Sequence, residues 1–396
     1  MKCKLEDIVD VTMGQSPKSE YYNTEGKGYP FLQGNRTFGF KYPTFDTYTT
    51  VMTKPAKAGD VIMSVRAPVG DLNITPVDMC LGRGVCSLRM KNGNQDFLFY
   101  MMKYYIPHLL KKESGTVFGS VNRNDINGLE VNIPEDAQVQ KEIARYLEMI
   151  DDKIELNNAI NNNLEQQAQT LFKSWFIDAP ESSSWETGTF SDIIETMIAG
   201  DWGKDSPTGN NTEMVYCIRG ADIPDVKSGN KGKMPTRFIL PKNYAAKHLV
   251  AGDVVVEISG GSPTQSTGRI ASISQSLLDR YDKGMVCTNF CKAMKPKSGY
   301  SMFVYYYWQY LYDKKVFFLY ENGTTGIKNL DISGFIETEP IILPPAELVE
   351  KFDAFCHSIF NVIFANGLQN EQLANMRDAL LPKLMSGEVD VSELDL

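Results

Sequence analysis

Histidine and paired cysteine are scarce in this 396-residue chain. It has three histidines and seven cysteines, an odd number without the spacing of a disulfide framework. Cys287 and Cys291 form one C-x3-C pair with no second pair nearby, so we expect no zinc site. No apolar run is long enough to span a membrane, and the first residues lack the apolar core of a signal peptide. These absences favour a reduced, cytoplasmic setting.

Sequence motifs of catalysis are also missing. There is no G-x4-G-K-[ST] phosphate loop and no G-x-G-x-x-G after a strand. The chain has no Asn-Pro-Pro-aromatic or Asp-Pro-Pro-aromatic motif, with which an amino-methyltransferase holds a flipped adenine. G-x-S-x-G and H-E-x-x-H are absent as well. We therefore expect no catalytic residue, no metal and no cofactor in this chain.

The net charge of −9 is concentrated in particular segments. Residues 1–137 hold 16 basic and 15 acidic side chains, and residues 182–345 hold 17 of each. The excess of acid lies in 138–181 and 346–396. The net charge therefore neither excludes nor supports a DNA partner, since the neutral segments can carry a local basic face.

Two stretches show the alternating three- and four-residue spacing of a coiled-coil seam. The first ladder is Ile143, Leu147, Ile150, Ile154, Asn157, Asn161, Leu164, Ala168, Leu171 and Trp175. The second ladder is Phe352, Cys356, Ile359, Ile363, Asn366, Asn370, Leu373, Arg377, Leu380 and Leu384. Each position of the second is displaced by 209 residues from the first. The pattern predicts two copies of one long helix.

Two asparagines interrupt each ladder at matching positions. If the helices pair antiparallel, Asn157 faces Asn370 and Asn161 faces Asn366, because the residue numbers of facing positions add to a constant. A buried amide pair costs stability but disfavours every slipped register in which an amide lies against Leu or Ile. We interpret the four asparagines as determinants of register. The alternative is that they face solvent and only weaken the seam.

The segments before the two ladders repeat as well. Matching pairs are Leu5–Ile8 with Phe190–Ile193, Phe31–Gly34 with Cys217–Gly220, Ala58–Val61 with Ala251–Val254, and Ile133–Pro134 with Leu343–Pro344. The offset changes along these segments, which indicates loops of variable length on a constant scaffold. Residues 60–65 and 253–258 predict strands, and 97–110 and 302–319 predict aromatic-rich helices, the second of them with strand as an alternative for part of its length.

These patterns predict an α+β protein with two repeated mixed α/β domains, separated by two long antiparallel coiled-coil helices and related by pseudo-two-fold symmetry. The expected parts are a first domain (1–137), a helix (138–178), a linker (179–185), a second domain (186–345), a second helix (346–385) and an acidic tail (386–396).

Several segments carry a family resemblance by their order. They are Ser64–Gly70, the stretch from Gly115-Thr116 to Asp125-Ile126 that leads into Ile133-Pro134, Gln138–Ile143 at the start of the first helix, and Leu380–Val389 near the chain end. In this order, duplicated over essentially the whole chain, they resemble the specificity (S) subunit of type I restriction-modification systems. No single motif is specific; the duplicated order is.

The resemblance implies a non-catalytic subunit with two target recognition domains, each reading one half of a split DNA sequence. The implied partners are double-stranded DNA, two DNA adenine methyltransferase subunits and two restriction-translocase subunits, which would bind S-adenosylmethionine, ATP and Mg. Ile143 to Trp175 spans roughly 48 Å at about 1.5 Å per residue. Such a spacer suits two readers about one helical turn (~10 bp) apart. The alternative is a coiled-coil adaptor that binds protein or RNA.

Candidate DNA contacts are polar or basic residues in turns rich in Gly or Pro, since Lys and Arg contact phosphates and Gln, Asn, Arg, Ser and Thr read base edges. In the first domain they are Lys18, Gln33, Asn35, Arg36, Arg66, Arg83, Asn122 and Arg123; in the second they are Lys204, Arg219, Thr264, Gln265, Arg269, Thr325, Lys328 and Asn329. We expect a minority to touch DNA, the rest being solvated loop residues. Gly260–Thr264 departs from Arg66–Gly70, which suggests that the two half-sites differ.

Overall fold

The computed structural model describes residues 1–111, 119–262, 264–323 and 327–391, and it divides into two compact units. Unit 1 comprises Met1–Glu155 and Leu373–Leu396, and unit 2 comprises Leu156–Gln372. The two long helices, α4 (Ala137–Phe172) and α10 (Ala346–Ser386), each contribute residues to both units.

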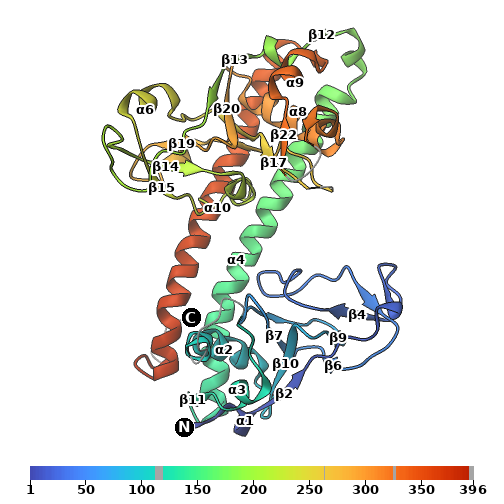
Figure 1. The fold of residues 1–396 in the computed structure, drawn as a ribbon, viewed down its shortest axis with the longest axis vertical. Coiled ribbons are helices and arrows are strands. Elements are labelled where there is room, and N and C mark those ends of the chain that lie inside the picture. The colour runs from blue at the N-terminus through green and yellow to red at the C-terminus, as the bar shows by residue number, and fades with distance from the viewer. Residues whose placement is uncertain (112–118, 263, 324–326, 392–396) are drawn as a thin grey trace. The chain divides into compact units, whose positions relative to one another are not determined.

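Unit 1 combines short strands with few helices (Figure 1). Its strands are β1 (Lys2–Lys4), β2 (Val9–Met13), β3 (Tyr22–Asn23), β4 (Tyr29–Leu32), β5 (Tyr48–Thr49), β6 (Pro55–Ala56), β7 (Val61–Ser64), β8 (Leu72–Ile74), β9 (Met79–Leu81), β10 (Val85–Met90) and β11 (Glu130–Asn132). Its helices, besides parts of α4 and α10, are α1 (Leu5–Ile8), α2 (Gln95–Leu110) and α3 (Arg123–Asn127).

Unit 2 repeats this composition. Its strands are β12 (Glu186–Gly188), β13 (Ile194–Ala199), β14 (Glu213–Ile218), β15 (Thr236–Ile239), β16 (Val254–Glu257), β17 (Ser259–Gly260), β18 (Ile270–Ser272), β19 (Met285–Cys287), β20 (Cys291–Pro296), β21 (Glu321–Asn322), β22 (Lys328–Leu330) and β23 (Ile341–Leu343). Its helices are α5 (Ile223–Lys227), α6 (Pro241–Lys247), α7 (Gln275–Leu278), α8 (Ser301–Asp313) and α9 (Ile332–Thr338).

The strand order of the two units is the same in its main features. Unit 1 has an antiparallel sheet β2-β10-β7-β8, and unit 2 has the matching sheet β13-β20-β16-β18. Beside each lies a second sheet with one parallel pair, β4 with β9 in unit 1 and β14 with β19 in unit 2. The repeat seen in the sequence is therefore a repeat of topology.

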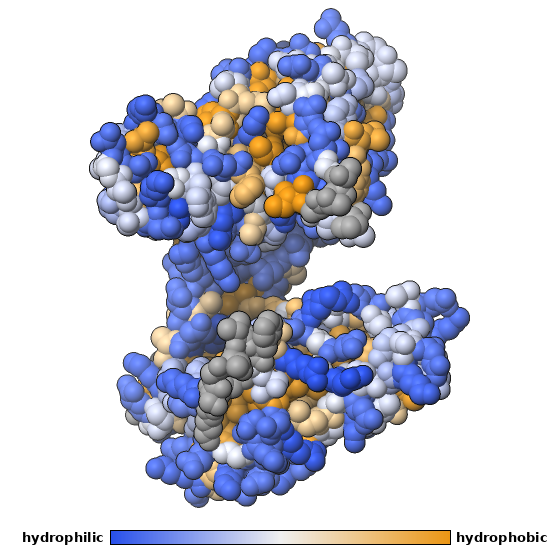
Figure 2. All heavy atoms as spheres, in the orientation of Figure 1, coloured by the Kyte–Doolittle hydropathy of each residue, from blue (hydrophilic) through white to orange (hydrophobic). Residues whose placement is uncertain are grey.

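Aromatic helices cover the antiparallel four-stranded sheets of both units. α2 packs on β7, β8 and β10, and α8 packs on β18 and β20. Residues 302–319 hold no strand, which removes that alternative, because α8 is followed by a 3-10 turn at Val316–Tyr320. Trp308 of α8 is fully buried in the core of unit 2. The apolar side chains left on the drawn face of each unit form small patches (Figure 2).

In unit 2 the two long helices pair antiparallel through amides. Asn157 Nδ2 donates to Asn370 Oδ1 at 2.8 Å, and Asn366 Nδ2 donates to Asn161 Oδ1 at 2.8 Å. Asn157, Asn161 and Asn370 are at most 6% exposed, and Asn366 is half-buried. Asn157 Oδ1 is buried without a hydrogen-bond partner, so the amide layer carries a desolvation cost.

In unit 1 the same two helices are joined by a buried charge. Asp151 is 0% exposed and accepts hydrogen bonds from Arg377 Nη1 at 2.6 Å and from the Tyr100 hydroxyl at 2.9 Å. Lys103 Nζ lies 3.6 Å from the same carboxylate, and its burial lowers the pKa of that amine. A carboxylate thus holds α2, α4 and α10 together in this unit.

Candidate nucleic-acid interface

In unit 1, four chain segments lie side by side at the end of the parallel β4–β9 pair. Gly82 N donates to Leu32 O at 2.8 Å, and Gly84 N donates to Gln33 O at 3.0 Å. Val65 N then donates to Gly84 O at 2.9 Å, and Val121 N donates to Val65 O at 3.0 Å. These backbone bonds fix the loops after β4, β9 and β7 relative to one another.

Two glycines make this close approach possible. A Cβ on Gly84 would lie 2.3 Å from Gln33 O, and one on Gly82 would lie 2.6 Å from Gln33 Cα. A Cβ on Gly14 would likewise lie 2.0 Å from Gly82 O. Any side chain at these positions would push the loops apart. The Gly82-Arg83-Gly84 sequence is therefore explained by packing rather than by a nucleotide fingerprint.

Between these contacts three polar side chains face solvent. Gln33, Arg66 and Arg83 are exposed, and none has a side-chain hydrogen bond or ion pair with a described residue. Arg66 is also held in place by a backbone bridge to Ser120. We call the surface formed by Gln33, Arg66 and Arg83 the unit 1 edge. Its amide and two guanidinium groups are donors without acceptors, as a phosphate or base-edge ligand requires.

Unit 2 repeats three of these four backbone bonds with different residues. Thr288 N donates to Ile218 O at 3.0 Å, Ile258 N donates to Phe290 O at 2.8 Å, and Leu330 N donates to Ile258 O at 2.8 Å. The close approach is repeated too, since a Cβ on Gly200 would lie 1.9 Å from Thr288 O. By these bonds Arg219, Asn289 and Ser259 occupy the positions of Gln33, Arg83 and Arg66. We call them the unit 2 edge.

A hollow of about 470 Å³ opens at the unit 2 edge. It is lined by Trp202, Arg219, Gly220, Ala221, Glu257, Ser259, Thr288, Asn289 and Phe290. Arg219 donates from Nε and Nη2 to the two oxygens of Asp222, at 2.9 and 3.1 Å. Burial alone would raise the pKa of the Asp222 carboxyl, but the hydrogen bonds from Arg219 and from backbone amides lower it. The Arg219 guanidinium is thus fixed by an ionised partner.

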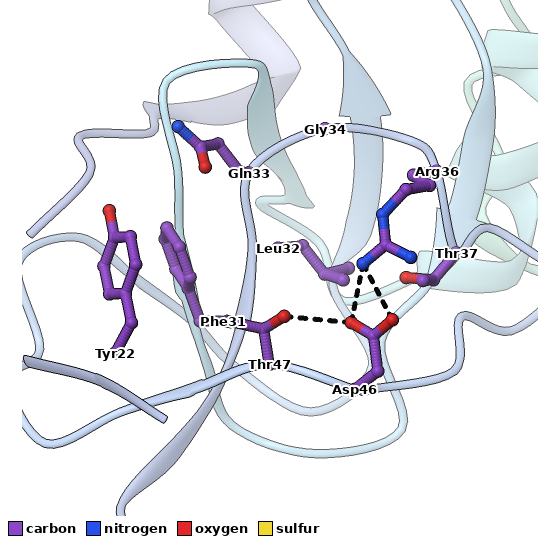
Figure 3. A pocket seen from close by; sticks show the side chains of 9 residues that line it. All are labelled: Tyr22, Phe31, Leu32, Gln33, Gly34, Arg36, Thr37, Asp46 and Thr47. Atoms are coloured by element: carbon purple, nitrogen blue, oxygen red, sulfur yellow. Dashed lines mark hydrogen bonds and ion pairs between the residues drawn. The ribbon is translucent and has the colours of Figure 1, made fainter. Parts of the chain in front are cut away.

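Unit 1 has a smaller hollow on the Arg36 side of Gln33 (Figure 3). Arg36 Nη2 donates to both oxygens of Asp46, at 2.8 and 2.7 Å, and these bonds lower the pKa of the Asp46 carboxyl. Figure 3 shows Gln33 pointing away from this ion pair, while the Tyr22 and Phe31 rings lie beside each other. Gln33 therefore lines this hollow without joining the ion pair, and its exposed amide also belongs to the edge.

Comparisons with known proteins match this chain to members of one family. Residues 1–166 match the model of the type I restriction modification DNA specificity domain. A putative type I restriction enzyme MjaX specificity subunit of Methanocaldococcus jannaschii is 38% identical over 168 residues, which are 42% of this chain and 39% of that relative. The type I restriction enzyme MjaIX specificity subunit of the same organism is 26% identical across 99% of this chain and 94% of its own length.

The chain is a relative of type I restriction-modification specificity subunits. A solved structure supports the same fold: the type I restriction-modification S subunit from M. genitalium has a TM-score of 0.56 at 16% identity, covering 97% of this chain and 95% of that one. The family resemblance and the α+β fold in two domains are thereby confirmed.

The other predicted DNA contacts of this specificity-subunit relative are scattered, and most already have partners. Lys18 and Lys204 are exposed, and Lys18 lies 3.8 Å from Glu20. Further pairs are Asn35 with Asp71, Arg123 with Val11 O, Arg269 with Glu257, Lys328 with Glu321, and Asn329 with Ser259. Asn122 caps α3, and Thr264 and Gln265 lie in an exposed turn at Ser262. Thr325 lies outside the described residues.

Two points of the sequence interpretation need correction. Lys328 and Asn329 lie in strand β22 and Arg123 in helix α3, so the candidates are not all in turns. The sequence interpretation also missed Ser259 and Asn289 of the unit 2 edge, and Trp202 and Phe290 of its hollow. Aligning Met79-Cys80-Leu81 with Met285-Val286-Cys287 would have found Asn289 and Phe290, because it places Asn289 opposite Arg83 and Phe290 opposite Gly84.

The described residues offer little for metal chemistry. Within them, no group of three or more His, Cys, Asp or Glu side chains is arranged to hold a metal ion.

None of the helices traced in the described ranges has both the length and the apolar character that crossing a bilayer demands.

Proposed function

We propose that this chain is the DNA specificity subunit of a type I restriction-modification complex and reads a bipartite, asymmetric target. Each unit reads one half-site through its edge. The observation that carries the proposal is the backbone pattern repeated in both units with different side chains on it. A shared scaffold with exchanged contact residues gives two readers of one geometry and two specificities.

The chemistry of the unit 1 edge suits base reading. Gln contacts the N6 and N7 atoms of adenine, and Arg contacts the O6 and N7 atoms of guanine in the major groove. The Arg66 and Arg83 guanidinium groups and the Gln33 amide are exposed and make no hydrogen bond to another described side chain or backbone group. Lys18 and Lys204, which match each other in the repeat, suit phosphates because they are exposed cations near the edges.

In each unit a loop outside the edge contacts the long helices. In unit 1, Lys41 is 2% exposed and donates to Glu148 of α4 at 2.7 Å. Burial would lower the pKa of Lys41, but the bond and charge of Glu148 raise it. In unit 2, Asn161 of α4 donates to Ser228 O at 3.2 Å, and Gly367 of α10 packs against Gly229 O. We propose that these attachments, with helices common to both units, set the spacing of the two half-sites.

We further propose that the outer faces of the helices dock the methyltransferase subunits, to which the translocase subunits are added. Large apolar side chains are exposed there at intervals of four, seven or fourteen residues, which place them near one face of a helix: Met149, Leu156 and Ile160 on α4, and Phe355, Val362 and Met376 on α10. Exposed apolar stripes of this kind mark protein interfaces. The reaction itself would then reside in the partners, with this chain supplying recognition.

The test is binding of the chain, assembled with its methyltransferase subunits, to duplexes with an intact target or with one half-site scrambled. We expect each scramble to weaken binding strongly, since specific sites are typically 10³–10⁷-fold tighter than non-specific DNA. Equal affinity for all three duplexes, or preference for RNA, would overturn the proposal in favour of an adaptor.

A further inference from the structure

Unit 2 has an aromatic pair at its edge that unit 1 lacks. Phe290 is 58% exposed and Trp202 is 37% exposed, and both line the hollow. The corresponding positions in unit 1 are Gly84 and Ser16, which offer no apolar surface. A single exposed apolar residue is ordinary on a protein surface, but these two rings line one hollow on the surface proposed to meet DNA.

The Trp202 ring and the backbone of Phe290 are held before any ligand arrives. The Arg237 guanidinium lies 4.1 Å from the centre of the Trp202 ring and donates from Nε to Trp202 O at 2.8 Å. The backbone of Phe290 is fixed from both sides, since its N donates to Thr288 Oγ1 at 3.2 Å and its O accepts from Ile258 N at 2.8 Å. A fixed apolar wall loses little conformational entropy on binding.

The charged groups of the hollow are already occupied. Arg219 uses Nε and Nη2 on Asp222, and Nη2 also donates to Lys233 O at 2.7 Å, so neither bidentate edge of its guanidinium is free to grip guanine. Glu257 receives Arg269 Nε and Nη2 on its two oxygens, at 2.7 and 2.6 Å, which leaves it poorly placed to accept from cytosine N4. Asn289 is different, because it is exposed without a described side-chain partner.

An A·T base pair matches the other groups of the hollow, which are its two aromatic rings and the Asn289 amide. It presents the C5-methyl group of thymine, an apolar feature, and the N6 and N7 atoms of adenine, which an asparagine amide contacts. We infer that the hollow of unit 2 takes the C5-methyl group of a thymine in the major groove between Trp202 and Phe290, and that Asn289 contacts the adenine of that pair. This inference rests on the proposed function and adds a base identity to it.

The experiment replaces each thymine of the target by deoxyuridine, one at a time, and measures affinity of the assembled complex. Deoxyuridine differs from thymidine only by the methyl group. We expect one position at which the loss is about fourfold, the value for burial of one methyl-sized group. Phe290→Ala should bind the thymine and uracil duplexes equally at that position.

Two variants serve as controls. Leu319→Ala removes another exposed apolar side chain of unit 2, 83% exposed, and should keep the discrimination. Phe290→Leu keeps an apolar wall and should keep part of the discrimination between thymine and uracil. This variant separates loss of the contact from misfolding. The inference is overturned if no thymine is distinguished from uracil, or if Phe290→Ala still distinguishes them. In either case dependence on intact half-sites would leave the proposed function standing.

Discussion

The edges of unit 1 and unit 2 share a backbone and differ in the state of their side chains. Unit 1 presents two arginines and a glutamine whose side chains have no partner among the described residues, whereas unit 2 pairs Arg219 and Arg269 with carboxylates and presents aromatic rings and an asparagine. On the proposed function, this difference means that specificity is exchanged by replacing side chains between fixed backbone bonds. The glycines and the hydrogen-bonded loops preserve the geometry while the chemistry changes.

The contacts between the two long helices also differ between unit 1 and unit 2. Unit 1 joins α4 and α10 through the buried Asp151–Arg377 ion pair, and unit 2 joins them through asparagine amides. Removing one partner of a buried ion pair leaves an uncompensated charge, whereas replacing both partners of an amide pair by apolar groups can be neutral or stabilising. The two halves of the seam should therefore respond in opposite directions to substitution.

The largest effect is expected at Asp151. Asp151→Ala removes the buried carboxylate that Arg377 and Lys103 share, and Arg377 keeps its pair with the exposed Asp378. The change should lower the free energy of unfolding by about 3–5 kcal/mol. Asp152→Ala, next in sequence and 61% exposed, is the matched control, with an expected change of up to about 1 kcal/mol. Chemical denaturation measures both. Equal losses would show that the buried charge has no special part in unit 1.

The next largest effect is expected at Arg83, and it concerns the affinity for DNA. Arg83→Ala should weaken binding by about 1–3 kcal/mol and relax the preference at one base pair only, as expected for a base contact. Lys18→Ala, if it removes a phosphate contact, should weaken all duplexes alike and reduce the salt dependence. A competition assay over single-base variants of the target distinguishes the two. Uniform weakening by Arg83→Ala would make that residue a phosphate contact.

The arginine–carboxylate pairs of the two units should differ in stability. Asp222→Ala should cost about 1–3 kcal/mol, because the 2% exposed Asp222 also accepts backbone bonds from Arg219 and Lys233. Its pKa is lowered in the folded state, so this contribution is present at neutral pH and is lost as the pH falls through the lowered pKa. Asp46→Ala, at an exposed pair, should change stability little. Thermal unfolding at pH 7 and in acid measures both variants.

The smallest effect is expected in the amide layer. Asn157→Leu combined with Asn370→Leu removes an unpaired buried oxygen and should raise stability by on the order of 1 kcal/mol. It should also weaken the preference for one spacing between the half-sites, because an apolar seam tolerates slipped registers. Melting temperature and affinity for targets with altered spacers test this. Unchanged stability together with unchanged spacing would remove the role given to these asparagines.

Sequence alone located the parts with regular spacing. The heptad ladder gave both long helices and the facing of Asn157 with Asn370, because one helix period fixes which side chains share a face. The edges were found only in part. Gln33, Arg66 and Arg83 were included as turn residues, but their alignment depends on backbone bonds between loops distant in sequence, which no local pattern encodes. Arg36 and Arg269 look equally suitable in sequence, yet each is held by a nearby carboxylate.

The central claim is that equivalent edges read different half-sites, and a reciprocal comparison of Arg83→Ala with Asn289→Ala tests it most directly. Base preferences of the assembled complex would be measured across the whole target for each variant. The account predicts that Arg83→Ala relaxes preference in one half-site only and Asn289→Ala in the other only. Relaxation of the same half-site by both variants, or an unchanged preference in both, would contradict it.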